Sequence, residues 1–157
     1  MHQVSSEWYT PGYIWNRVYK TFSTDKVYDP CPILGKNGLV LDWKHEFIYC
    51  NPPSPCYDFA VKTLNTFNFR VSKNLHTSII YAAFSESILF QYPELYINHT
   101  LCMVRKRIRW IDSSTLVESD KPRNYNAFIL LTTRSTIRNQ FAINFGDIGK
   151  ILTVKEL

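Results

Sequence analysis

Apolar residues recur along the chain in two spacings, which predict alternating helices and strands. Helical spacing marks residues 11–21, 57–67, 85–92 and 135–143. The first helix has Thr10 as a candidate N-cap and Pro11 at its first position. Strand-like apolar runs cover residues 27–28, 46–50, 77–84, 101–104, 107–111 and 127–132. Because helices separate most of these runs, we expect an α/β fold whose sheet is mostly parallel, with an antiparallel edge near the C-terminal end.

The length of the chain limits it to one domain. With 157 residues and 45% hydrophobic content, it can bury a single substantial core, so we expect residues 1–157 to fold together. The first residues lack an apolar stretch of signal-peptide length, and no segment approaches the roughly 20 apolar residues that span a bilayer. We therefore expect a cytosolic protein with no membrane partner.

Four cysteines are present, and none of them forms a Cys-x-x-Cys pair: Cys31, Cys50, Cys56 and Cys102. Three lie in or beside apolar runs, which predicts buried, reduced thiols. A zinc site built from Cys50, Cys56 and a histidine is the alternative interpretation, although the spacing typical of such ligands is missing.

Positive charge is concentrated in the C-terminal half. Lys and Arg number 18 against 13 Asp and Glu, a formal charge of +5. The basic residues of this half are Arg105, Lys106, Arg107, Arg109, Lys121, Arg123, Arg134 and Arg138. A surface stripe of this kind is a candidate phosphate-binding site, and Trp110 and Tyr125 among the charges favour nucleic acid because aromatic rings stack on bases. A solvated basic face without a partner is the alternative.

The segment Asn51-Pro52-Pro53-Ser54 follows an apolar strand and is the strongest functional motif. Proline fixes φ and donates no N–H, so its carbonyl is held rigidly at the end of the strand. An asparagine oxygen together with such a carbonyl can accept both hydrogens of an amine. The same four residues are also an ordinary way to end a strand, since Pro, Asn and Ser favour turns.

Further segments extend this motif into a family resemblance. They are Glu7-Trp8-Tyr9-Thr10-Pro11, then Tyr28-Asp29-Pro30-Cys31, then Leu41-Asp42-Trp43, then Cys50-Asn51-Pro52-Pro53. In this order and spacing the chain resembles the small, Dam-like phage-type DNA adenine-N6 methyltransferases. The stretch Arg107-Ile108-Arg109-Trp110-Ile111-Asp112 and the apolar run from Ala127 to Leu131 also look like the family's C-terminal half, so the resemblance spans most of the chain. It implies a reduced Rossmann-like methyltransferase sheet.

The resemblance also implies a binding site for S-adenosylmethionine. Thr10 and Pro11 would contact the methionine part, and Asp29 with Pro30 would lie at its ammonium group. Asp42 follows the apolar triplet Leu39-Val40-Leu41, and an acid after such a run can bind a ribose hydroxyl. Trp8 or Trp43 would flank the adenine ring. For Asp29 the alternative is a turn-forming aspartate before proline, and for the two tryptophans it is a place in the core.

On the acceptor side, the resemblance implies that a flipped adenine presents its amine to Asn51 and to the carbonyl of Pro52. Ser54 departs from the family, in which an aromatic residue stacks on the base, so Tyr57 or Phe84 would take that part. Arg107, Arg109 and Arg123 are candidate phosphate contacts.

The chain would act on DNA in the host cell of a virus or prophage. Because a single small module reads only a few base pairs, site recognition would come from the loops around Ile111 to Asn126 or from a second subunit in a homodimer. The alternatives are a degenerate methyltransferase that only binds nucleic acid, and a methyltransferase that acts on RNA adenine.

Overall fold

A computed structural model describes residues 8–31, 38–53, 57–84, 86–119 and 126–157. The predicted site residues Ser54 and Arg123, like Cys56 and Tyr125, lie outside these ranges.

The centre of the molecule is a five-stranded sheet with the order β2-β3-β6-β4-β7. Its strands are β2 (Phe47–Cys50), β3 (Ser78–Ala83), β4 (Thr100–Val104), β6 (Ala127–Thr132) and β7 (Gly149–Thr153). Only β2 and β3 are parallel neighbours, and every other neighbouring pair is antiparallel. The prediction of a mostly parallel, Rossmann-like sheet is therefore wrong.

The error lies in which strands are neighbours. Helical connections link β2 to β3, β3 to β4 and β6 to β7, and in each case the two linked strands run in the same direction. However, β6 inserts between β3 and β4, and β4 inserts between β6 and β7. A helical connection fixes the relative direction of two strands but does not make them adjacent, so interleaving turns same-direction strands into antiparallel neighbours.

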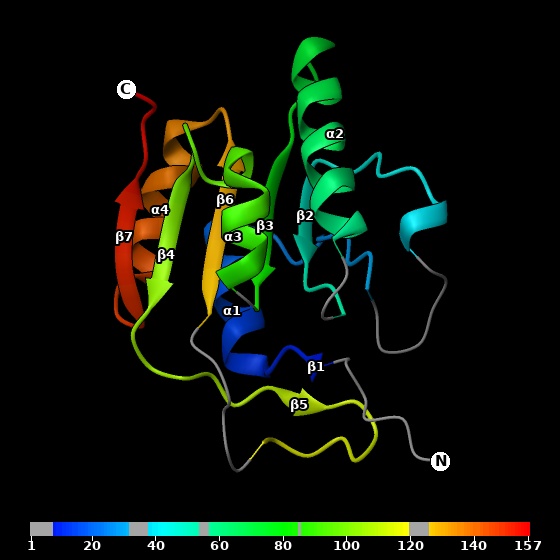
Figure 1. The fold of residues 1–157 in the computed structure, drawn as a ribbon, viewed down its shortest axis with the longest axis vertical. Helices are drawn as coiled ribbons and strands as arrows, with labels where there is room; N and C mark the ends of the chain where they lie inside the picture. Colours follow the sequence, from blue (N-terminus) through cyan, green and yellow to red (C-terminus); the bar gives the residue numbers. More distant parts are fainter. Residues whose placement is uncertain (1–7, 32–37, 54–56, 85, 120–125) are drawn as a thin grey trace.

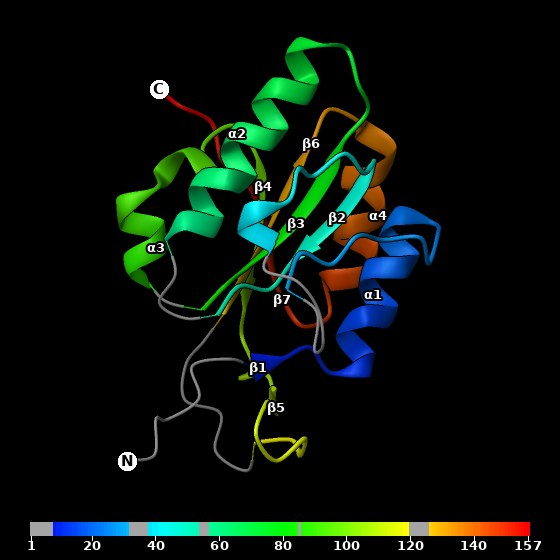
Figure 2. The same ribbon diagram turned by 90° about the vertical axis from the view of Figure 1, so that its right-hand side faces the viewer.

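Helices cover both faces of the sheet (Figures 1 and 2). On one face lie α1 (Gly12–Phe22) and α4 (Ser135–Phe145), and on the other lie α2 (Asp58–Ser72) and α3 (Glu86–Gln91). Two short 3-10 helices are η1 (Gly38–Val40) and η2 (Pro93–Leu95). Within the described ranges, no helix has the length and apolar character needed to cross a membrane.

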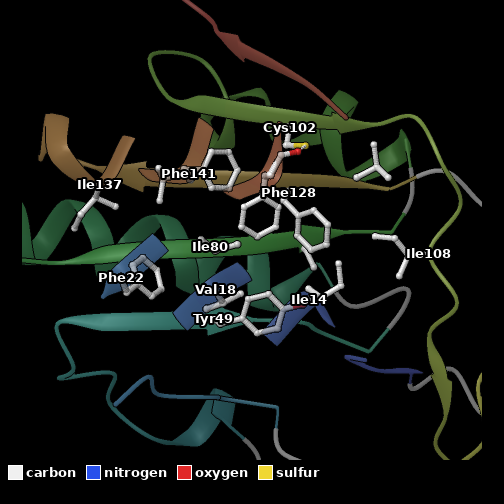
Figure 3. Close-up of a cluster of buried hydrophobic side chains, with 14 of the residues drawn as sticks. Ile14, Val18, Phe22, Tyr49, Ile80, Cys102, Ile108, Phe128, Ile137 and Phe141 are labelled. Atoms are coloured by element: carbon white, nitrogen blue, oxygen red, sulfur yellow. Dashed lines mark hydrogen bonds between the residues drawn. The ribbon is translucent and has the colours of Figure 1, made fainter. Parts of the chain in front are cut away.

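Two buried clusters sandwich the sheet because its central strands are apolar on both faces. Every residue of β3 and β6 is buried. The α1/α4 cluster includes Ile14, Tyr49 and Phe128, which Figure 3 shows packed together, and the α2/α3 cluster includes Trp43, Cys50 and Phe59. Alternate residues of each strand thus belong to opposite clusters, as the pleat of a β-strand requires.

A second, two-stranded sheet lies beyond the C-terminal ends of β2, β3 and β4 (Figure 1). It pairs β1 (Trp8–Tyr9) with β5 (Ile111–Asp112) in antiparallel fashion. The predicted strand at 27–28 is present only as an isolated parallel bridge between Tyr28 and Ile48. The bridge places Tyr28 beside β2. Because the bridge is parallel, the residues after Tyr28 lie at the same end of the sheet as the residues after β2.

His99, just before β4, should make folding stability depend on pH. Burial lowers the pKa of His99, and its ring lies edge-on to Phe67 at 5.4 Å. The folded chain therefore binds this proton more weakly than the unfolded chain does, so the stability is complete above the unfolded pKa of about 6.5 and is lost as the pH falls below it. Urea unfolding of the His99→Phe variant, which keeps a ring against Phe67, should show a weaker loss between pH 7 and pH 5. An equal loss in both proteins would contradict this assignment.

Candidate functional site

Three strands of the main sheet run in the same direction, so their C-terminal ends lie together at one end of the sheet, called here the carboxyl edge. These are β2, β3 and β4, which end at Cys50, Ala83 and Val104. Asn51, Phe84 and Arg105 follow at this carboxyl edge, and the small β1–β5 sheet lies just beyond it (Figure 1). The edge therefore collects residues from distant parts of the sequence, as ligand sites in α/β sheets do.

The side chain of Asn51 is held in one orientation. Its Nδ2 donates to the carbonyl oxygen of Trp8 at 2.6 Å and to Oγ1 of Thr10 at 3.1 Å. A backbone carbonyl can only accept, so the amide nitrogen must face Trp8 and the amide oxygen must point away from it. Oδ1 of Asn51 is buried and has no hydrogen-bond partner among the described residues. The site thus contains an oriented, unsatisfied hydrogen-bond acceptor.

Thr10 lies between Asn51 and the buried strand β2. Its Oγ1 is 2.9 Å from the hydroxyl of Tyr49, a residue of β2 that is completely buried. Trp8, Thr10 and Asn51, predicted from two separate motifs, therefore do come together. The hydroxyl of Thr10 binds Asn51 and Tyr49 in this structure, an arrangement that the family resemblance did not predict. Pro11 is buried beside Thr10, and its carbonyl accepts the first backbone hydrogen bonds of α1.

Asp29 follows the Tyr28 bridge at the same edge. Its Oδ1 accepts a hydrogen bond from the backbone N–H of Cys31 at 2.8 Å, as in an aspartate turn. Burial raises the pKa of Asp29, with the hydrogen bond from Cys31 opposing the rise. No Lys, Arg or His of the described ranges forms an ion pair with it. Pro30 is buried against Gly38, where a side chain would collide with the Pro30 carbonyl.

Cys31, Cys50 and Cys102 are free thiols; Cys50 and Cys102 are buried as predicted, whereas Cys31 is only partly buried. Burial raises the pKa of the Cys50 thiol, which also forms a hydrogen bond with Cys31. In the part of the chain that the structure describes, no three His, Cys, Asp or Glu side chains gather as a metal site would require. The zinc alternative also needed Cys56, which lies outside that part.

The two aromatic candidates for base stacking lie on opposite faces of the sheet. Phe84 packs against the α1/α4 cluster, to which Tyr49 also belongs, and its ring is 4.6 Å from Trp110. Asn51 is two residues beyond Tyr49, so its side chain returns to this same face. Tyr57 instead packs against the α2/α3 cluster, where its hydroxyl is 3.1 Å from that of Ser87. The geometry therefore favours Phe84 over Tyr57.

Trp110 and Asn126 support the position of Phe84. Nε1 of Trp110 donates to Oδ1 of Asn126 at 3.0 Å, and both side chains are buried. Asn126 also donates to the carbonyl of Ala83, the residue before Phe84. Trp110 is thus a core residue under Phe84, and the proposal that its ring stacks on a base receives no support from this position.

Asp42 and Trp43 lie elsewhere, in a groove between η1 and α2. The groove has a volume of about 920 Å³ and is also lined by Lys62 and Phe69. Trp43 is 4% exposed and donates from Nε1 to the carbonyl of Gly38 at 2.9 Å, which confirms the core interpretation for this tryptophan. The structure does not bring Asp42 into the group formed by Trp8, Thr10 and Asn51, so this position gives its predicted ribose contact no support.

The basic residues do not form one stripe. Arg105, Lys106, Arg107 and Arg109 are exposed in the loop after β4, at the carboxyl edge. Arg134 lies at the opposite edge, where it forms an ion pair with Glu46 at 2.9 Å, and Arg138 donates to the carbonyl of Thr132. The prediction of a single stripe is therefore wrong, because β6 carries the chain from one edge of the sheet to the other.

Sequence reasoning missed two residues of this site, Tyr49 and Asn126. Tyr49 stands within an apolar run, where nothing distinguishes a hydrogen-bonded hydroxyl from ordinary core.

Comparisons with protein-family models, with curated proteins and with solved structures found no match to this chain.

Proposed function

We propose that the protein is an S-adenosylmethionine-dependent methyltransferase that acts on the N6 amine of adenine in DNA. One observation carries the proposal: the buried Oδ1 of Asn51 has no partner among the described residues, although the amide that bears it is fixed by Trp8 and Thr10. A buried acceptor without a partner is costly, and in native structures such an atom is usually satisfied by an ordered water, an ion or a ligand. An amine N–H is the kind of donor that this oxygen requires.

Asp29 fits the methionine end of the cofactor. Its carboxylate is largely withdrawn from water and has no ion-pair partner in the described ranges. An ammonium group carries three donors and a positive charge, which are what such a carboxylate lacks. Asp29 and Asn51 also follow adjacent parallel segments, joined by the Tyr28–Ile48 bridge. The proposed site requires only that these two segments be parallel neighbours, so that Asp29 and Asn51 lie at the same end. It does not require the whole sheet to be parallel.

The reaction requires the protein mainly to position two groups. When bound, S-adenosylmethionine supplies a methyl group on a sulfonium, which is a good leaving group. Asn51 Oδ1 would accept one N–H of the adenine amine, and the Pro52 carbonyl would accept the other. With both hydrogens bound, the nitrogen lone pair would be free to point at the methyl carbon. As the N–C bond formed, the S–CH3 bond would break, S-adenosylhomocysteine would leave, and the methylated nitrogen would release one proton to solvent. Most of the rate enhancement would come from orientation and electrostatics. Phe84 would stack on the base in place of the family's aromatic residue.

The basic loop at the carboxyl edge supports a nucleic-acid substrate. Its exposed residues Arg105, Lys106, Arg107 and Arg109 lie at the same edge as Asn51. Cations beside the site would hold backbone phosphates while the base enters, and this binding would depend strongly on salt.

Replacing Arg107 and Arg109 together by glutamine should weaken binding of all DNA sequences alike. Loss of two phosphate contacts should reduce the slope of log affinity against log salt by about 1.8 for duplex DNA and about 1.4 for single strands. Fluorescence anisotropy over a salt series measures both quantities. The matched control is the Arg134→Gln and Arg138→Gln pair at the opposite edge, which should leave the slope unchanged. Equal effects of the two pairs would remove the basic loop from the proposed interface.

A degenerate methyltransferase that binds nucleic acid without turnover is the second candidate, and the observation in its favour is Ser54. This residue stands where the family has a stacking aromatic, and such stacking is worth about 1–3 kcal/mol per base. RNA adenine is the alternative acceptor for an active enzyme. We also propose a homodimer in the cytoplasm of a host cell carrying a virus or prophage, and sedimentation of the intact chain at assay concentration tests the dimer.

The deciding experiment is transfer of labelled methyl from S-adenosylmethionine to unmethylated DNA and RNA, followed by nucleoside analysis. Label in N6-methyladenine from DNA is the expected result. Label only in RNA would reassign the acceptor. Binding of S-adenosylmethionine without any transfer would favour the degenerate protein, and no binding at all would overturn the proposal.

A further inference from the structure

We infer that Tyr49 is a positioning residue that fixes the acceptor oxygen of Asn51 through the hydroxyl of Thr10. The inference rests on the proposed function for its catalytic consequence, but the arrangement itself is present in the free protein. Three contacts make up the relay: Tyr49 hydroxyl to Thr10 Oγ1 at 2.9 Å, Thr10 Oγ1 to Asn51 Nδ2 at 3.1 Å, and Asn51 Nδ2 to the Trp8 carbonyl at 2.6 Å.

Two of the three relay contacts have a fixed direction. Asn51 Nδ2 has two hydrogens, and the Trp8 carbonyl and Thr10 Oγ1 accept one each. In the third contact either hydroxyl can be the donor, and Thr10 Oγ1 can accept from Asn51 in both cases because it has two lone pairs. The three contacts together fix the position of Thr10 Oγ1 and with it the plane of the Asn51 amide.

Tyr49 is suited to this part because its own side chain is closely packed. It is completely buried, with its ring 4.7 Å from that of Trp15 and packed in the α1/α4 cluster beside Ile14 and Val18 (Figure 3). Its hydroxyl is therefore held by β2 and α1 together. Thr10 lies between β1 and α1, so the relay ties three elements to the orientation of one amide. Pre-organisation of this kind spares the enzyme the cost of ordering the acceptor during the reaction.

The Tyr49→Phe variant tests the relay because it removes one hydroxyl and keeps the buried ring. The matched control is Tyr81→Phe, which removes a tyrosine hydroxyl that is equally buried but lies on the α2/α3 face of the neighbouring strand. Thr10→Val removes the middle of the relay, and Thr10→Ser restores it. Thermal unfolding and the backbone amide spectrum establish that each variant is folded.

The first readout needs no substrate: the side-chain amide signals of Asn51 in ¹⁵N NMR spectra of the free protein. Tyr49→Phe and Thr10→Val should shift these signals and speed exchange of their hydrogens with water, while Tyr81→Phe and Thr10→Ser should leave them close to wild type. Unchanged Asn51 signals in Tyr49→Phe, or equal changes in Tyr81→Phe, would overturn the inference.

The second readout is methyl transfer. Loss of one relay hydrogen bond should lower kcat about tenfold with little change in the KM for S-adenosylmethionine. Because both variants break the same relay, the Tyr49→Phe and Thr10→Val double variant should be no slower than Thr10→Val alone. If the wild-type protein transfers no methyl group but the NMR changes occur as described, the proposed function fails and the positioning of Asn51 by Tyr49 stands. Normal kcat with altered NMR signals would show that the relay has no catalytic consequence.

Discussion

The Asn51→Ala variant should transfer methyl groups about 10²–10³-fold more slowly than the wild type, by comparison with the loss of one pre-organised hydrogen-bonding group in other active sites. Alanine removes the buried Oδ1 that we propose as the acceptor for the adenine amine. The affinity for S-adenosylmethionine should stay nearly constant, because Asp29 is independent of the amide. Single-turnover transfer with saturating cofactor measures the chemical step, and calorimetry measures the affinity.

Two further variants make this test specific. Asn65→Ala removes an asparagine from the exposed face of α2 and should have no effect on the rate. Asn51→Asp keeps an acceptor oxygen but places a second oxygen against the Trp8 carbonyl, which can only accept, so it should restore the rate incompletely. Full transfer by Asn51→Ala would show that the amine is held elsewhere, and the proposal for this site would have to be abandoned.

Most of the secondary structure could be predicted from the sequence, because strong periodicity and turn residues mark the elements. The last strand run, at 127–132, coincides with β6, and the predicted helix at 11–21 differs from α1 by one residue at each end. Two strands were missed, β1 and β7. The first is only two residues long, and the second has no buried residue, so neither leaves a clear apolar pattern.

The order of strands could not be predicted in the same way. The alternation of helices and strands led to the prediction of a mostly parallel sheet, and it did not indicate that β6 would run in the opposite direction between β3 and β4. The choice of neighbour depends on contacts between residues far apart in the sequence, such as Tyr81 with Ile129 and Leu101 with Ile129. These residues are apolar wherever they are placed, so the sequence pattern does not distinguish one neighbour from another.

The candidate site could likewise be predicted only in part. Trp8, Thr10 and Asn51 were each predicted from a short motif, and the fold brings them into hydrogen-bond contact. Asp42 was predicted from its place after an apolar run, and the structure puts it in the groove beside α2 instead. Thr10 and Asn51 each stand directly before a proline at the end of a strand, so the turn limits where the side chain emerges. A single acid in an irregular segment carries no such constraint.

The Asp29→Asn variant should bind S-adenosylmethionine about 10- to 150-fold more weakly, since a charge-assisted hydrogen bond is worth about 1.5–3 kcal/mol. The substitution keeps an oxygen to accept from the N–H of Cys31 but removes the charge that we propose for the ammonium group. Calorimetric titration measures this loss. A control at another aspartate, Asp25→Asn on the exposed turn after α1, should bind normally.

The same Asp29→Asn variant should be more stable than the wild type at neutral pH. Burial raises the pKa of Asp29 in the folded chain, so this carboxyl stabilises the fold only while it is protonated, below its unfolded pKa of about 3.9, and that stability is lost as the pH rises through the folded value. Urea unfolding should therefore show an advantage for asparagine at pH 7 that disappears near pH 3. A residue that lowers the stability of the fold but strengthens ligand binding has its role in ligand binding. If asparagine weakened binding and also destabilised the fold at pH 7, Asp29 would be a structural turn residue, and its place in the cofactor site would be lost.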